Sequence, residues 1–339
     1  MKTQGIVKFW CRVFLLGIPL IICLVSIVVG DPFKVIYKYN FGNYYDDQPF
    51  ELNRDYVSTQ MLLSQSRQSP PDAFIFGSSR SFSYLCESWQ KENQEARCFH
   101  YPAASENLYG IYAKIKLIDR LNLKISHALL IMDYHAFDLE SRKDHLHILH
   151  PAETGDGWLN YETAYLEACF SKLFVLKYID YKLAGRIHWY TRDIFQIEPG
   201  NVRIMPLTND YVFAAEERQL AANEDAFYES RRLLFTSRKV EPHEASAVIG
   251  SAQLRHLSEI KAIFDKHKTD YRIIISPLYD QVSLNRSDLA QLEAIFGKEH
   301  VSNYSGTNEI TVNMRNFYDP DHYRPFIAEA ILRKAIPAR

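Results

Sequence analysis

The stretch Val13–Val29 (VFLLGIPLIICLVSIVV) is uncharged and almost entirely apolar, and it constrains this chain more than any other segment. With the apolar residues just before it, the stretch reaches the roughly 20 residues that a helix needs to cross a bilayer. Three basic residues precede it and one acidic residue follows it: Lys2, Lys8, Arg12 and Asp31. The positive-inside rule therefore predicts a cytoplasmic N-terminus and an extracytoplasmic remainder. A cleaved signal peptide is the alternative, but the length of the run favours an uncleaved single-pass anchor through residues 9–29.

Beyond residue 72, short apolar runs alternate with amphipathic segments. The runs predict strands, and the longer segments predict helices. We expect strands over 73–76, 97–101, 127–132, 271–276 and 301–304, and helices over 82–90, 106–121, 245–267, 287–296 and 325–335. The helix over 106–121 is expected to be capped by Ser105. This alternation predicts an α/β domain with three layers, doubly wound around a mainly parallel sheet.

The same pattern divides the chain. Residues 1–30 form a cytoplasmic tip and anchor, 31–71 a juxtamembrane lead-in with a helix over 56–66, and 72–337 the α/β domain. A mostly helical insertion at about 139–242 interrupts that domain, with helical spacing over 161–185 and 210–235. The insertion could be a lid or a partner surface, but additional packing is the simpler interpretation.

A glycine and two serines follow the first predicted strand, in the order Gly77, Ser78, Ser79 and Arg80. A serine at such a strand–turn–helix junction is presented at the end of the strand, beside helix N-terminal amides that can stabilise a substrate oxyanion. The alternative is that Ser78 or Ser79 only caps the helix.

Near the C-terminus, Asp319 and His322 are separated by two residues. At that spacing a turn can direct the carboxylate to one imidazole nitrogen and leave the other free to take a proton. A polar loop with a capping aspartate is the alternative. Because ligands bind beyond the carboxyl ends of parallel strands, Ser79 and the Asp319/His322 segment should converge at one edge of the sheet.

These two motifs give the chain a resemblance to the SGNH/GDSL hydrolase superfamily, in which the nucleophilic serine ends strand one and a C-terminal DxxH supplies the acid and base. The closer likeness is to its membrane-anchored bacterial branch, which includes the D-alanyl lipoteichoic acid and alginate O-acetylation proteins. The resemblance rests on Gly77-Ser78-Ser79-Arg80 and on the tail from Asn303 to Arg324, and it covers about 72–138 and 245–337.

The resemblance implies that Ser79 is the nucleophile, His322 the general base and Asp319 its orienter, with Asp321 as the rival carboxylate. The Ser79 amide would be one oxyanion donor. The family's glycine after strand two and asparagine after strand three are absent here. The backbone of Ala104 or Ser105 and the side chain of Asn107 are the expected substitutes.

Two arginines are further candidates for this site. Arg80 and Arg324 could bind a phosphate or a uronate carboxylate, although pairing of each with a local group is the simpler expectation.

Charge and histidine content limit other functions. The net charge of -2 gives no indication of nucleic-acid binding. His145, His147 and His150 could suggest a metal site, but without a supporting ligand cluster they are more typical of a polar surface. We therefore expect no metal and no cofactor.

The cysteines indicate the environment of the domain. Cys86 and Cys98 could form a disulfide outside the cytoplasm, which spacing alone leaves open. Cys169 lies on an apolar helical face and is expected to be a buried thiol.

The resulting hypothesis is a bacterial inner-membrane protein whose extracytoplasmic domain transfers or hydrolyses an acyl group, most simply acetyl, on a cell-surface glycan or polymer. The resemblance also implies a membrane-bound O-acyltransferase as partner. The alternatives are a catalytically inactive scaffold that binds a glycan or such a partner, and a simple esterase.

Overall fold

Five parallel strands form the central sheet, in the order β2–β1–β3–β7–β9. Their bounds are β1 (Ala73–Gly77), β2 (Cys98–Pro102), β3 (His127–Met132), β7 (Asp270–Ile275) and β9 (Val301–Asn303). Each predicted strand agrees with an observed one to within one residue at either end. The structure is a computed structural model that describes the chain except residues 1, 40, 42–48, 92–95, 139–143, 156, 196, 198–200, 237, 239–240 and 337–339, and the side chains of 2–5, 7 and 11.

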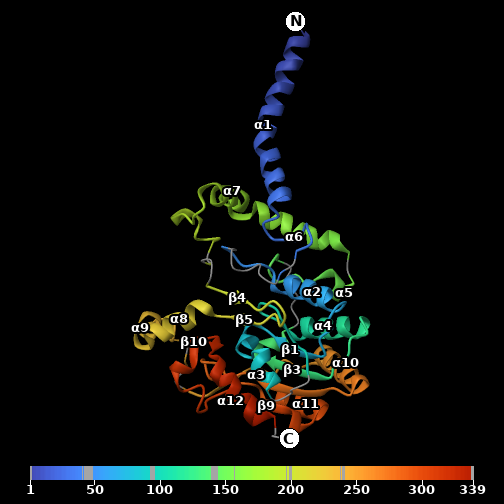
Figure 1. Cartoon of the computed structure of the whole chain (residues 1–339), viewed down its shortest axis with the longest axis vertical. Coiled ribbons are helices and arrows are strands. Elements are labelled where there is room, and N and C mark those ends of the chain that lie inside the picture. Colours follow the sequence, from blue (N-terminus) through green and yellow to red (C-terminus); the bar gives the residue numbers. More distant parts are fainter. Residues whose placement is uncertain are drawn as a thin grey trace.

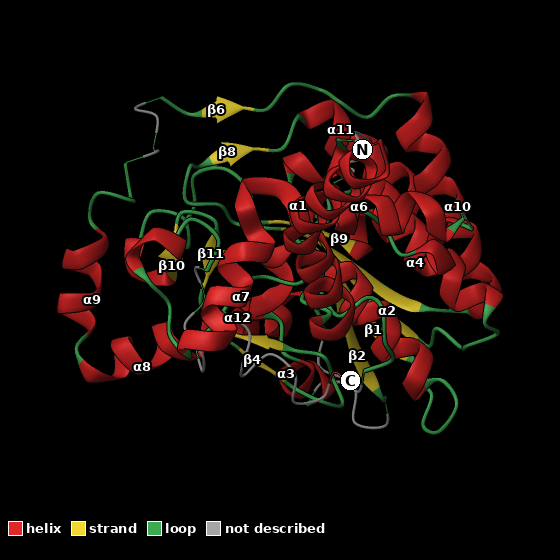
Figure 2. Cartoon of the chain, turned by 90° about the horizontal axis from the view of Figure 1, so that it is seen from above, coloured by secondary structure: helices red, strands yellow, loops and turns green. Residues whose placement is uncertain are grey.

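Helices cover both faces of the sheet, as Figures 1 and 2 show. Alternate strand residues enter two separate hydrophobic cores, with Phe74, Phe76 and Phe99 in one and Ile75, Leu129 and Ile131 in the other. The first core also contains side chains of α2 (Arg54–Gln65), α4 (Leu108–Arg120), α10 (Ser251–His267) and α11 (Arg286–Phe296). The second contains those of α3 (Cys86–Gln90) and α12 (Pro325–Ala335). The predicted α/β class with a mainly parallel sheet is therefore confirmed.

Three predicted helix starts were wrong. The segment after β1 first forms a short 3-10 helix, η3 (Ser79–Ser83), and only then α3. Helix α4 begins at Leu108 and is capped by Asn107, not by Ser105, whose φ of 49° lies in the left-handed region. Residues 245–250 are not helical, and α10 begins at Ser251, where Gln253 accepts a hydrogen bond from the Gly250 amide.

The described part of the insertion contains α-helices and short strands. Its elements are α5 (Pro151–Thr154), α6 (Trp158–Phe170), α7 (Phe174–Ala184), β4 (Arg203–Ile204), β5 (Tyr211–Val212), α8 (Ala214–Ala222), α9 (Glu224–Arg231) and β6 (His243–Glu244), which pairs with β8 (Val282–Ser283). The helix expected over 161–185 is broken where Lys172 and Leu173 adopt left-handed φ values of 47° and 58°. The segment expected as a helix over 210–235 begins with β5 and is divided at Asn223, which caps α9. The predicted start of the insertion at residue 139 lies outside the described residues.

The N-terminal helix α1 (Lys2–Gly30) projects from the domain in Figure 1. Its portion Lys8–Gly30 is long and apolar enough to cross a membrane, and only 11% of its most apolar window is buried. The lead-in that follows is part of the main core, because Phe33, Phe50 and the α2 residues Val57 and Leu62 are all buried there.

The structure also answers the two predictions about the cysteines. Cys86 and Cys98 form a disulfide that joins the start of α3 to the start of β2. Cys169 is a buried free thiol, as expected.

Candidate active site

The turn after β1 presents one serine and uses the other as a cap. Gly77 has a φ of 155°, and a Cβ there would lie 2.6 Å from the Ile131 carbonyl oxygen, so the turn requires glycine. Ser78 is the N-cap of η3, and its Oγ accepts a hydrogen bond from the Arg80 amide at 3.4 Å. Ser79 is the first residue of η3, which leaves its hydroxyl free of the capping role.

The C-terminal motif lies on a β-hairpin rather than in a loop. Strands β10 (Phe317–Asp319) and β11 (His322–Tyr323) pair around a two-residue turn. One carboxylate oxygen of Asp319 accepts hydrogen bonds from the backbone amides of Asp321 and His322, at 2.8 and 3.0 Å. The aspartate thus fixes both the turn and the position of the histidine that follows it.

Ser79, His322 and Asp319 form a continuous hydrogen-bonded relay. His322 Nδ1 lies 2.9 Å from both carboxylate oxygens of Asp319, and His322 Nε2 lies 2.9 Å from Ser79 Oγ. Because a carboxylate can only accept, Nδ1 carries the proton and Nε2 accepts from the serine hydroxyl. Burial opposes the charge of Asp319, but the hydrogen bonds from His322 and the two amides outweigh it and lower the pKa of this carboxyl.

Asp321, the rival carboxylate, is engaged elsewhere. It lies 2.9 Å from Arg80, whose guanidinium also binds the buried Asp133 at 2.7 Å. Burial acts against the charge of Arg80, but the two carboxylates raise its pKa. Arg80 therefore lines the site with its charge already balanced. Asp133, which follows β3, was not identified from the sequence as its partner.

Arg324, unlike Arg80, does not line the cavity at Ser79. Its guanidinium binds Glu224 of α9 at 2.8 Å, and it is not among the described residues that line the cavity at Ser79. The prediction that it could contact a ligand beside Ser79 is therefore not supported by its position.

The segment after β2 forms the opposite side of the site. Ala103, Ala104, Ser105, Glu106 and Asn107 all line a cavity of about 360 Å³ that also contains Ser79 and His322. Asn107 Oδ1 accepts from the Gly110 amide at 3.0 Å and so caps α4. The residues expected to replace the missing oxyanion donors, Ala104, Ser105 and Asn107, therefore line the same cavity as Ser79 and His322, and Asn107 has a structural role there as well.

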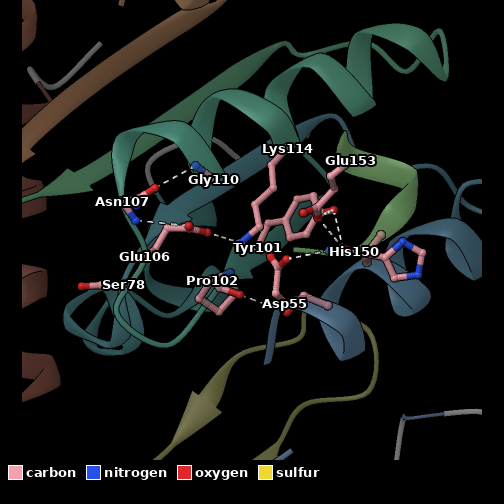
Figure 3. A network of polar contacts seen from close by, with 12 residues as sticks. Asp55, Ser78, Tyr101, Pro102, Glu106, Asn107, Gly110, Lys114, His150 and Glu153 are labelled. Atoms are coloured by element: carbon pink, nitrogen blue, oxygen red, sulfur yellow. Dashed lines mark hydrogen bonds and ion pairs between the residues drawn. The ribbon is translucent and has the colours of Figure 1, made fainter. Parts of the chain in front are cut away.

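A buried ionic network borders this cavity and was missed from the sequence (Figure 3). Lys114 of α4 is fully buried, lies 2.8 Å from Asp55 of α2 and also contacts Glu106. Burial opposes the charge of Lys114, but the carboxylates raise its pKa, whereas burial raises the pKa of Glu106 to about 7. The signal was present in the sequence, since Lys114 falls on the apolar stripe of its helix between Ile111 and Ile118.

Glu153 extends the network. Its Oε1 accepts from Tyr101 at 2.6 Å and from Thr59 at 2.5 Å. Burial, reinforced by Asp55, raises the pKa of Glu153 well above its usual range. Glu153 Oε2 is a buried oxygen without a hydrogen-bond partner among the described residues, next to the Asp55 carboxylate that helps to raise this pKa.

A second serine–histidine–aspartate arrangement lies behind the first but is buried. His100 Nε2 is 2.8 Å from Ser81 Oγ, and His100 Nδ1 is 3.3 Å from Asp210. Ser81 donates its hydroxyl hydrogen to the Ser78 carbonyl at 2.7 Å, so His100 must donate through Nε2, the reverse of His322. Burial lowers the pKa of His100. This arrangement supports the serine turn and offers no nucleophile.

The three histidines of the HLHILH motif lie in different environments. His145 contacts the Phe33 ring, His147 binds Asp144 at 2.8 Å and lines the cavity, and His150 is buried against Gln60. The expectation of a polar surface is wrong for His150, because its ring caps α5. Within the described residues no group of three or more His, Cys, Asp or Glu side chains could hold a metal ion.

One aromatic residue of the insertion completes the site. Phe213, between β5 and α8, packs against His322, with ring centroids 5.3 Å apart and the two rings inclined at 52°. The sequence alone did not indicate this contact.

No protein-family model matches the chain, and no similar protein was found among curated sequences. The function must therefore be argued from the site itself.

Proposed function

We propose that the protein is a serine-dependent acyltransferase or esterase whose reacting group is the Ser79 hydroxyl. The observation that supports this most strongly is the relay from Asp319 through His322 to Ser79, with both links at 2.9 Å, at the wall of a cavity. A serine hydroxyl is a weak nucleophile by itself and becomes effective beside an oriented general base.

The relay can carry both halves of an acyl transfer. Ser79 Oγ attacks the acyl carbonyl carbon while its proton passes to His322 Nε2, and Asp319 stabilises the imidazolium. The leaving alcohol takes that proton as the carbon–oxygen bond of the donor ester breaks, which leaves an acyl ester on Ser79. An acceptor hydroxyl then gives its proton to His322 and attacks the ester, which restores the serine; water as acceptor gives hydrolysis.

The oxyanion of each tetrahedral intermediate needs hydrogen-bond donors. The amide of Ser79 lies at the N-terminal end of η3, where backbone N–H groups have no helical acceptor. Ala104 and Ser105 line the same cavity, just beyond Pro102, which pairs with Gly77 in the sheet, and their backbone would supply the second donor. Removal of one such donor typically costs about 10²–10³ in kcat.

The cavity favours an uncharged, hydroxyl-rich substrate. Four carboxylates line it, those of Asp55, Glu106, Asp138 and Asp321, whereas Arg80 is bound to two acids. Three of these carboxylates are themselves paired with Lys114 or Arg80, and Arg80 has no uncompensated charge to offer an anionic phosphate or uronate. Of the glycan substrates considered from the sequence, a neutral sugar hydroxyl therefore suits the site better than a polyuronate.

The resemblance to the membrane-anchored SGNH branch agrees with this chemistry. It supports an anchor in the bacterial inner membrane, an extracytoplasmic site and a membrane-bound O-acyltransferase partner that would supply the acyl group. The Cys86–Cys98 disulfide favours an oxidising compartment.

The test uses the full chain in detergent with p-nitrophenyl acetate as donor and a neutral oligosaccharide as acceptor. We expect p-nitrophenolate release and acetylated oligosaccharide in the mass spectrum. Ser79→Ala and His322→Ala should each reduce turnover by orders of magnitude, and the double variant should be no worse, because the groups act as one unit. Unchanged turnover in both folded single variants would favour the inactive scaffold instead.

A further inference from the structure

Helices α6 and α7 expose a continuous apolar stripe. The stripe consists of Leu159, Leu166, Phe170, Leu173, Leu176 and Leu183, all of which are exposed. Helical spacing places Leu159, Leu166 and Phe170 along one side of α6 and Leu176 and Leu183 along one side of α7, with Leu173 at the turn between the helices. On the other side of these helices, the buried residues are Tyr161, Tyr165, Phe174 and Tyr178. An apolar surface of this extent marks an interaction site.

This stripe, here named the α6–α7 face, lies where α1 meets the domain. In Figure 1 the two helices run across the base of α1. Tyr178 of α7 donates a hydrogen bond to the carbonyl of Gly30, the last residue of α1, at 3.1 Å.

The junction between α1 and the domain is held by several contacts. The Asp31 carboxylate accepts hydrogen bonds of 3.0 Å from the amides of Val35, Ile36 and Tyr37. Phe33 stacks on Phe174 with ring centroids 4.7 Å apart. The α6–α7 face is therefore held at a defined position relative to the axis of α1.

The chemistry of the surrounding residues matches a lipid headgroup region. Trp189 is 82% exposed, and Trp158 and Tyr190 are exposed beside the same helices. Aromatic side chains of this kind gather at membrane–water interfaces. Residues 158–193, which span both helices, carry five basic and four acidic side chains, so the charge of this surface is nearly balanced and the match to the headgroup region rests on the apolar and aromatic side chains.

We propose that the α6–α7 face lies in the outer interface of the membrane that α1 spans, with its leucines below the headgroups. The inference rests on the membrane-spanning assignment of α1. It goes beyond the proposed acyl transfer, because it makes part of the insertion a second membrane contact. The domain, and with it the cavity at Ser79, would then have a fixed orientation to the bilayer.

The test measures the depth of Trp189 in the full chain. Of the four tryptophans, Trp10 lies in α1 and Trp89 is buried in the core. The variant Trp10→Phe/Trp158→Phe is reconstituted in vesicles of phosphatidylcholine and phosphatidylglycerol that contain lipid labelled with a doxyl quencher near the headgroup. We expect blue-shifted Trp189 emission, strong quenching by this lipid, and loss of the quenching in Leu176→Glu/Leu183→Glu.

A matched control uses an equally exposed position away from α1. Leu233 follows α9 and is 83% exposed. Leu233→Trp, in a chain in which Trp10, Trp158 and Trp189 are replaced by Phe, should be quenched by aqueous iodide and not by the labelled lipid.

Quenching of Trp189 by iodide but not by lipid would overturn the proposal, as would equal lipid quenching at residue 233. The first result would favour a protein partner on this face. Quenching of Trp10 by lipid in a chain in which Trp158 and Trp189 are replaced by Phe shows separately whether α1 is inserted. The measurement therefore distinguishes failure of this inference from failure of the anchor.

Discussion

Replacement of Asp319 by asparagine removes the carboxylate that orients His322 but keeps an oxygen that can hold the hairpin turn. The amide oxygen of the new side chain can still accept from the backbone amides of Asp321 and His322, which hold the hairpin turn. Its amide nitrogen, however, would face His322 Nδ1, which now lies 2.9 Å from Asp319 Oδ2. The side-chain N–H would donate to Nδ1, so the imidazole proton moves to Nε2 and points at Ser79. In that tautomer the histidine cannot take the serine proton.

The size of the effect follows from these two functions. In serine proteases with the same relay, this exchange costs about 10⁴ in kcat. That factor corresponds to about 5 kcal/mol of transition-state stabilisation. We expect a loss of about 10³–10⁴ in kcat/KM here, because both links of the relay are formed in this structure. Stability should change by only about 1 kcal/mol, since the backbone hydrogen bonds remain.

The assay compares hydrolysis of p-nitrophenyl acetate by the full chain and by Asp319→Asn, with thermal unfolding followed in parallel. The matched control is Asp321→Asn, which removes a carboxylate that lies on Arg80 and is 63% exposed. We expect the control to retain activity to within a few-fold. The reasoning is refuted if folded Asp319→Asn stays within about tenfold of the unaltered chain, or if Asp321→Asn loses as much activity.

Three further predictions concern stability. Gly77→Ala should destabilise the fold by about 2–5 kcal/mol in denaturant unfolding, because the new Cβ would lie 2.6 Å from the Ile131 carbonyl oxygen and the backbone has a positive φ. A loss below about 0.5 kcal/mol would contradict the turn geometry. Replacement of both Cys86 and Cys98 by Ala should cost about 2–4 kcal/mol, since the bond closes a loop over a sequence separation of 12, and an unchanged melting temperature would argue against the disulfide. The raised pKa of Glu153 means that the native state binds more protons than the unfolded state, so stability should fall as pH rises above about 4.3. Glu153→Gln should flatten this dependence, and an unchanged or steeper fall in the variant would contradict the raised pKa.

The strands and the relay could be predicted from local signals. Apolar runs and amphipathic spacing located all five strands of the main sheet, most clearly the inner strands that are buried on both faces, as the complete burial of Phe74, Ile75 and Phe76 in β1 illustrates. Ser79 and His322 were paired by topology, because the carboxyl ends of parallel strands share one edge. The distance between them, across 243 residues, comes only from the structure.

The features that could not be predicted depend on tertiary contacts that the periodicity of the sequence does not encode. The break between α6 and α7 occurs at Lys172 and Leu173, neither of which has a sequence signal for a left-handed backbone. Lys114 falls on the apolar stripe of its helix, but its partners Asp55 and Glu106 lie outside that helix, so periodicity does not identify them. Phe213 likewise reaches His322 from an insertion whose packing the pattern did not specify.

The central claim is that the imidazole of His322 activates the Ser79 hydroxyl. The most direct measurement is the rate at which a fluorophosphonate probe modifies the folded full chain, with the modified residue identified by mass spectrometry. Modification should occur at Ser79, persist in Ser78→Ala because Ser78 only caps η3, and slow by about 10² or more in His322→Ala. Modification confined to another serine, or a rate at Ser79 that does not depend on His322, would contradict the account.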